Sequence, residues 1–97
     1  MNKTDFDIEH LENAANRLKA MAHPLRIAII EMLESNGPSC VSDIFVKLDI
    51  EQAAASHHLN ILKNRGILKS ERVGKKIIYS LNNEMISEIV HCLSRCK

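Results

Sequence analysis

Two adjacent histidines, His57 and His58, pose the first chemical question of this chain. They lie in the segment EQAAASHHLNILKNRG, residues 51–66. Neighbouring side chains on a helix point about 100° apart, so the two rings cannot chelate one metal ion as an i, i+4 pair can. A catalytic pair would need a third group and a pocket, and the pattern implies no nearby carboxylate. The segment therefore favours a helix face that reads another molecule.

The same segment divides into two faces when it is placed on a helix. Ala55, Leu59 and Leu62 keep the i, i+4, i+7 spacing of a core face, and His58 beside them is expected to be a half-buried structural histidine. The other side is small and hydrogen-bonding, which suits close approach to base edges in the DNA major groove. Its candidate DNA-binding residues are Gln52, Ala53, Ser56, His57 and Asn60.

Basic residues are concentrated just after this segment. The formal net charge is only +1, but residues 63–76 hold six Lys and Arg against Glu71 alone, a local charge of +5. We expect Lys63 and Arg65 to contact phosphates at the end of the helix, and Lys75 and Lys76 to contact them from a hairpin tip. A solvated hairpin with lysines for solubility would show the same charges, so charge alone does not separate the two interpretations.

A second candidate site lies in HCLSRC, residues 91–96. Cys92 and Cys96 are i, i+4 neighbours, so on a helix their sulfurs share one face. With a third ligand they could bind a metal or metalloid ion such as Zn(II), Cd(II) or As(III), or they could undergo reversible modification by oxidants or persulfides. His91 points elsewhere but could serve a site shared with a partner subunit. The alternative is that Cys92 is a small core residue and Cys96 a terminal thiol.

The elements that must position these residues follow from hydrophobic periodicity. We expect one domain over residues 1–97, mainly α with a β-hairpin wing, in the order α-α-α-α-β-β-α. Ser39 is the expected N-cap of the third helix, Gly66 the left-handed cap of the fourth, and Gly74 the hairpin turn. The expected helices cover residues 6–21, 24–35, 40–48, 51–65 and 83–95, and the expected strands 67–73 and 76–81.

Two short helices joined by a tight turn and followed by a basic hairpin are typical of a winged helix-turn-helix that reads double-stranded DNA. The first and last expected helices carry more apolar surface than one small core can cover, which predicts a homodimer built on them. The stripes concerned are Ile8, Leu11 and Leu18 on the first helix, and Ile86, Ile89 and Leu93 on the last.

The stretch LDIEQAAASHHLNILKNRGILKSERVGKKIIYSL resembles the helix-turn-helix and wing of the ArsR/SmtB family of bacterial transcriptional repressors. SHHL at 56–59, the following LKNRGIL and the wing ending IIYSL carry the likeness, as does LKAMAHPLRIAIIEML at 18–33. It extends from about residue 10 to about residue 90. The resemblance implies a cytoplasmic homodimer whose first and last helices form the interface. It also implies repression at an imperfect palindromic operator, with release when an inducer binds.

This chain departs from the family's familiar inducer sites. Cys40 matches the first cysteine of the CVC pair of arsenic- and cadmium-sensing members, but Ser42 replaces the second. Asn83 and Met85 stand where zinc-sensing members begin the ligand set of the last helix, and neither is a good zinc ligand. Cys40 is expected to be inert. Two possibilities stay open: an inducer site at Cys92, Cys96 and His91, or a family member with no inducer site.

Other classes of function are less compatible with the sequence. A winged helix that binds only proteins would not need two lysines at the hairpin tip beside a polar helix face. An enzyme is not expected, because the chain shows no nucleophile-base-acid set and no phosphate-binding glycine loop. No apolar run is long enough to span a membrane, and MNKTDFDIEH does not resemble a signal peptide, so a cytoplasmic protein without a membrane partner is expected. Three cysteines, an odd number, predict no disulfide framework.

Overall fold

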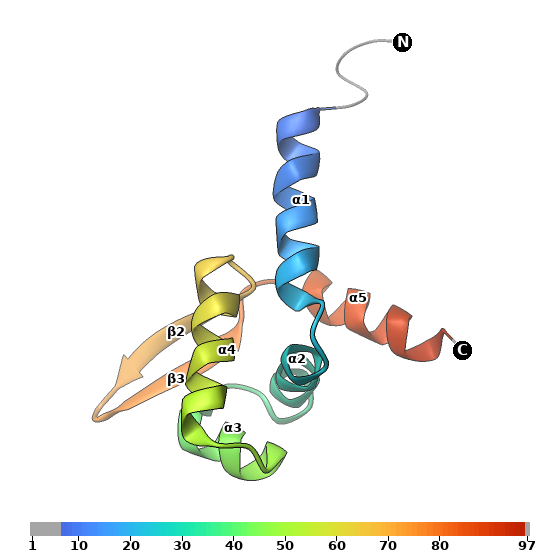
Figure 1. Ribbon diagram of the computed structural model, residues 1–97. Helices are drawn as coiled ribbons and strands as arrows, with labels where there is room; N and C mark the ends of the chain where they lie inside the picture. Colours follow the sequence, from blue (N-terminus) through green and yellow to red (C-terminus); the bar gives the residue numbers. More distant parts are fainter. Residues whose placement is uncertain (1–6, 97) are drawn as a thin grey trace.

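The computed structural model of the chain describes residues 7–96, which form five α-helices and a three-stranded antiparallel sheet (Figure 1). The predicted winged helix-turn-helix with its β-hairpin wing is confirmed. The elements are α1 (Ile8–Met21), α2 (Pro24–Asn36), β1 (Ser39–Cys40), α3 (Val41–Leu48), α4 (Gln52–Asn64), β2 (Leu68–Val73), β3 (Lys76–Leu81) and α5 (Glu84–Arg95).

The core is aliphatic and centres on α2, which contacts every other helix and strand β3. Only 3% of the chain is aromatic, so branched side chains must fill the interior. α2 places two of them, Ile29 and Ile30, fully out of solvent. The other large, fully buried side chains are Ile44, Leu59, Leu62, Ile67 and Leu68. Three of the predicted core positions of the reading segment, Ala55, Leu59 and Leu62, are therefore confirmed.

A left-handed residue sets the turn between α3 and α4. Asp49 has φ 53°, a conformation that aspartate tolerates better than most residues. Its backbone N–H donates to the carbonyl oxygens of Phe45 and Val46, and the N–H of Ile50 donates to that of Phe45 over 3.0 Å. These bonds satisfy the last carbonyls of α3 and leave only three residues before α4 begins. The angle between the two helices is therefore fixed by backbone geometry.

The end of α4 is fixed by the predicted cap at Gly66. Gly66 has φ 75°, its N–H donates to the carbonyl of Lys63 over 3.0 Å, and the N–H of Ile67 donates to that of Leu62 over 2.9 Å. This is a Schellman motif, in which glycine has no Cβ to oppose the left-handed conformation. Ile67 is then fully buried and the chain enters the wing. In the wing, Val73 pairs with Lys76 across a two-residue turn that begins at Gly74, with φ 65°.

The predicted order lacked one element, strand β1. Ser39 pairs with Tyr79 and Cys40 with Ile78, so β1 and β2 flank β3 in one sheet. Ser39 was therefore wrong as the N-cap of α3: its Oγ donates to the carbonyl of Gly37 over 2.9 Å, and Cys40 occupies the cap position without a side-chain bond. Two residues are too few to show the alternation that reveals a strand in sequence.

The terminal helices expose most of the apolar stripes predicted for a subunit interface, but Ile86 on α5 is partly buried and packs against the chain's own core. α1 projects from the rest of the molecule and meets it only near its C-terminal end (Figure 1). Ile8 and Leu18 on α1 are 63% and 53% exposed, and Leu93 on α5 is 58% exposed. No part of residues 7–96 covers these side chains. None of the helices formed by residues 7–96 is both long and apolar enough to cross a membrane.

Candidate nucleic-acid interface

Helix α4 separates its side chains as the sequence predicted. Ala55, His58, Leu59 and Leu62 are buried against the core. On the other side four of the five candidate reading residues are exposed and Ser56 is partly exposed; the five are Gln52, Ala53, Ser56, His57 and Asn60. The N-cap, Glu51, makes no side-chain bond to the first turn. Backbone N–H groups there are open to a partner, and a helix start favours an anionic one.

The wing tip and the reading face meet at one hollow. It has a volume of about 360 Å³ and lies between the start of α3, the face of α4 and the turn of the wing. Ser56, Lys75 and Lys76, which the sequence placed in separate segments, all line it. The hydroxyl of Ser56 on α4 and two cations of the hairpin thus face the same space. That arrangement can place base edges against the helix while phosphates meet the lysines.

The other two predicted phosphate contacts lie at the far end of α4. Lys63 and Arg65 are both exposed, but neither lines the hollow that Ser56 shares with the wing tip. α4 has 13 residues, so its ends are separated by about 20 Å. Arg65 instead lines a cleft against α1 together with Asn64 and Asn16. The structure therefore divides the predicted basic surface into two separate groups.

His58 is held inside the protein by Arg26, a residue that was not among the predicted site residues. Nε of Arg26 donates to Nδ1 of His58 over 3.1 Å, and the ring of His23 lies 4.6 Å from that of His58, between centroids. Burial lowers the pKa of His58, and the positive charges of His23, Arg26 and His57 lower it further. Because arginine can only donate, Nδ1 carries no proton and the neutral ring keeps its proton on Nε2. His58 is thus a structural anchor of α4, as expected.

The sequence HPLR, residues 23–26, carries a local signal for the anchoring role of Arg26. Nδ1 of His23 accepts from the backbone N–H of Leu25 over 3.1 Å, so His23 caps the start of α2. Arg26 follows on the first turn and also donates from Nη1 to the carbonyl of Ala20 over 3.0 Å. An arginine directly after a capped helix start, among apolar residues, is a candidate for a part-buried anchor. Its partner 32 residues away is visible only in the fold.

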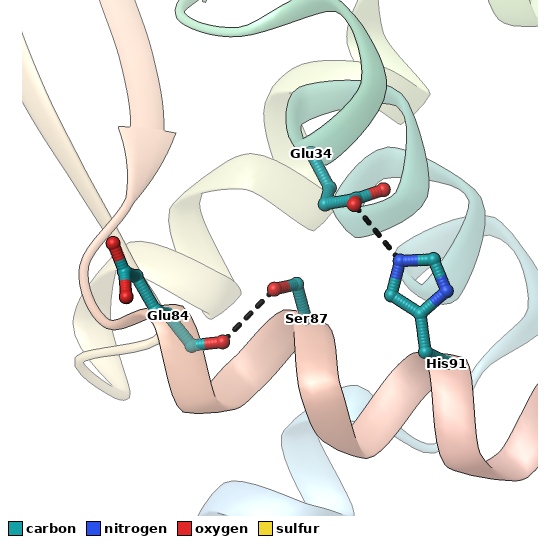
Figure 2. A network of polar contacts seen from close by, with 4 residues as sticks. All are labelled: Glu34, Glu84, Ser87 and His91. Atoms are coloured by element: carbon teal, nitrogen blue, oxygen red, sulfur yellow. Dashed lines mark hydrogen bonds and ion pairs between the residues drawn. The ribbon is translucent and has the colours of Figure 1, made fainter.

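The candidate thiol site is incomplete among residues 7–96 of one chain. Cys92 on α5 and Cys96, the C-cap residue just beyond the helix, are exposed free thiols, so Cys92 is not a residue of the chain's own core. His91 is held elsewhere: its Nε2 lies 2.8 Å from Oε1 of Glu34, which links α5 to α2 (Figure 2). Among residues 7–96, no three His, Cys, Asp or Glu side chains are grouped closely enough to hold a metal ion. Cys40 is buried, with Sγ 3.2 Å from Oγ of Ser42.

Comparison with known proteins identifies the family. The sequence profile described as "Bacterial regulatory protein, arsR family" matches residues 23–70, from the cap of α2 into β2. An uncharacterised helix-turn-helix transcriptional regulator of Methanocaldococcus jannaschii is 39% identical over 83 residues, which cover 86% of this chain and 93% of that protein. The chain belongs to the ArsR family. The predicted resemblance to this family is confirmed by the profile over residues 23–70 and by a relative that aligns with 86% of the chain.

Solved structures extend this ArsR-family likeness to three dimensions. The crystal structure of the transcriptional repressor PagR of Bacillus anthracis matches with a TM-score of 0.82 at 34% identity, over 90% of this chain and 99% of that one. HlyU of Vibrio vulnificus matches with a TM-score of 0.79 at 30% identity, over 97% and 96%. This ArsR-family chain is a DNA-binding transcriptional regulator, and its relatives are regulators rather than enzymes, as predicted.

A further relative is named for resistance to a metal. The cadmium resistance transcriptional regulatory protein CadC homolog of Staphylococcus aureus is 35% identical over 88 residues, which cover 91% of this ArsR-family chain and 73% of that protein.

Proposed function

We propose that the protein is a homodimeric repressor that reads an imperfect palindromic operator with the exposed face of α4 and the tip of the wing. The observation that carries the proposal is the hollow shared by Ser56, Lys75 and Lys76. A polar helix face and a cationic hairpin around one space match the two kinds of contact that a sequence-specific DNA complex needs. PagR, a relative of similar fold, is a transcriptional repressor.

The side-chain types on α4 fit direct reading of bases. The amides of Gln52 and Asn60 can bond to N6 and N7 of adenine, and the methyl of Ala53 can contact the methyl of thymine. Ser56 can pair with several bases, and His57 can donate to N7 or O6 of guanine or to a phosphate. Lys63, Arg65, Lys75 and Lys76 would hold the backbone and set the register.

Two copies of the chain would read two half-sites. Apart from Ile86, the apolar stripes of α1 and α5 are exposed in one chain, and covering them against a second copy would remove that surface from water. A two-fold dimer of reading heads requires a palindromic operator with half-sites about one helical turn, ~34–36 Å, apart. The dimer and the palindrome therefore belong to the same proposal.

The inducer is proposed to act at two exposed thiols, that of Cys92 on α5 and that of Cys96 just beyond the end of α5. Cys92 and Cys96 are neighbours at i, i+4 and accessible to a soft metal or metalloid ion or to a thiol-reactive compound. No third ligand lies beside them among residues 7–96, so one would come from another part of the dimer; His91 could supply it through Nδ1 while its Nε2 stays bonded to Glu34. The CadC homolog is named for cadmium resistance, which favours a thiophilic ion. The alternative is a family member that senses nothing.

Selection from a pool of random duplexes tests this function. The reduced protein should enrich duplexes with two inverted half-sites about one turn apart, and the enriched duplex should bind far more tightly than a scrambled one of equal length. A winged helix that only binds proteins would enrich no sequence and bind both duplexes alike.

A further inference from the structure

A basic cleft lies at the C-terminal end of α4, on the part of the molecule where α1 meets α2. It has a volume of about 490 Å³, and a smaller hollow of about 170 Å³ adjoins it, because Asn16, Asn64 and Arg65 line both. We call the two together the α1–α4 cleft. Its charged and amide groups include Arg17, Lys19, Arg26, Arg65, Asn16 and Asn64. No Asp or Glu among residues 7–96 lines the α1–α4 cleft.

The cations of the α1–α4 cleft have no counter-charge of their own. Among residues 7–96, the one ion pair joins His91 and Glu34, and neither lines this cleft. Arg26 is part-buried, and its two bonds, to His58 and to the carbonyl of Ala20, use two of its five N–H donors. A guanidinium held in place with donors to spare and no carboxylate partner is suited to bind an anion.

The α1–α4 cleft stays open if the protein dimerises through the stripe on α1. Asn13, Asn16, Arg17 and Ala20 follow the i, i+3, i+4, i+7 pattern of one helix face. At about 100° per residue, Leu11 and Leu18 of the apolar stripe lie on the opposite side of the helix. A partner that covers Leu11 and Leu18 therefore leaves the Asn13, Asn16 and Arg17 side of the cleft free.

We propose that the α1–α4 cleft binds a phosphate group. Guanidinium groups bond oxyanions in two-pronged fashion, and amide N–H groups from Asn16 and Asn64 add donors that a tetrahedral anion with several oxygens can use. The phosphate is either that of a small phosphorylated molecule or that of a DNA backbone, and the second source rests on the function proposed above. Because Arg26 also holds His58, an anion on Arg26 acts on an anchor of the reading helix.

Titration with inorganic phosphate tests the first source. Backbone amide resonances of the ¹⁵N-labelled protein are followed at constant ionic strength, with chloride as the reference salt. Saturable shifts are expected at Asn16, Asn64 and Arg65. Arg17→Gln and Lys19→Gln should each weaken the binding roughly tenfold, since each removes a charged donor. Lys47→Gln, which removes the same charge from an exposed position on α3, should leave the binding unchanged.

Salt-dependent DNA binding tests the second source. The salt slope is the slope of the logarithm of the DNA-binding constant against the logarithm of salt concentration. If inorganic phosphate gives no saturable shift, the double variant Arg17→Gln/Lys19→Gln should reduce the size of this slope on the selected duplex by about one to two units. Absence of both the shift and the slope change overturns the phosphate site. If the wild type binds no duplex selectively, the proposed function fails. The phosphate titration alone then tests the phosphate site: saturable shifts support it, and their absence overturns it.

Discussion

Nε of Arg26 donates to Nδ1 of His58 over 3.1 Å, joining the start of α2 to the buried side of α4. The residue before this histidine, His57, is exposed on the reading face. The anchor and the reading residue are therefore neighbours on one helix, and the position of His57 depends on how His58 is held. The bond requires an unprotonated Nδ1, so the anchor depends on pH.

Acid should weaken the fold through His58. Its pKa is lowered from 6.5 mainly by burial, so in the window between that lowered value and 6.5 the unfolded chain binds more protons than the folded one. Stability therefore rises with pH through this window and is lost as pH falls below about 6.5. Urea unfolding midpoints between about pH 7.5 and about pH 5.5 measure the loss.

Histidine variants separate this effect from general acid denaturation. His58→Gln should lower stability at neutral pH and flatten the pH dependence across the window, because the titrating group is gone. His10→Gln, a change at an exposed residue of α1, should keep the wild-type dependence. Equal pH dependence in wild type and His58→Gln would show that another group is responsible.

The dimer should depend on the stripe of α5. Ile89→Glu places a charge in the proposed interface and should give monomers or unfolded chain in sedimentation. Val46→Glu introduces the same charge on α3, where Val46 is 70% exposed and belongs to neither stripe, and should keep the dimer mass. A dimer of unchanged mass for folded Ile89→Glu would place the interface elsewhere.

The wing lysines should supply affinity without sequence preference. Lys75→Ala with Lys76→Ala should weaken binding to all duplexes alike and lower the salt slope by about one to two units, since two phosphate contacts are lost. Binding isotherms at several salt concentrations on selected and scrambled duplexes measure both effects. A change in base preference in this variant would mean that the wing, rather than α4, reads the sequence.

The two thiols of α5 should act as a unit in sensing. Cys92→Ser and Cys96→Ser should each leave DNA binding intact under reducing conditions, and each should abolish release by Cd(II), As(III) or persulfide. A coupling of ~1–3 kcal/mol between the sites corresponds to a 5- to 150-fold release in the unmodified protein. Cys40→Ser, at a buried thiol, should keep the response. Release that persists in the doubly substituted Cys92/Cys96 protein would exclude these thiols as the inducer site.

Apolar spacing and turn residues predicted most of the fold, because these patterns involve residues close together in the sequence. The face of α4 follows from the spacing of Ala55, Leu59 and Leu62, and the end of the helix from Gly66. Strand β1 was missed because its two residues become a strand only through pairing with β3. A tertiary partner of this kind leaves no local pattern.

The contacts that organise the candidate sites were the least predictable part. Glu34 meets His91 across 57 residues, and Arg26 meets His58 across 32. Neither pair has a helical spacing, and each depends on how α2 packs against its neighbours. The closeness of Ser56 to Lys75 and Lys76 likewise depends on the angle of the wing. The sequence named all three as candidate DNA contacts but did not show that they lie around one hollow.

Base preference of the α4 face is the most direct test of the central claim. Binding of wild type, Ser56→Ala and His57→Ala is measured on the selected duplex and on duplexes with single base-pair changes. Each variant should lose ~1–3 kcal/mol on the selected duplex and discriminate less at one position of each half-site, while affinity for scrambled DNA stays the same. Variants that keep the full wild-type preference at every position would contradict the assignment of α4 as the reading helix.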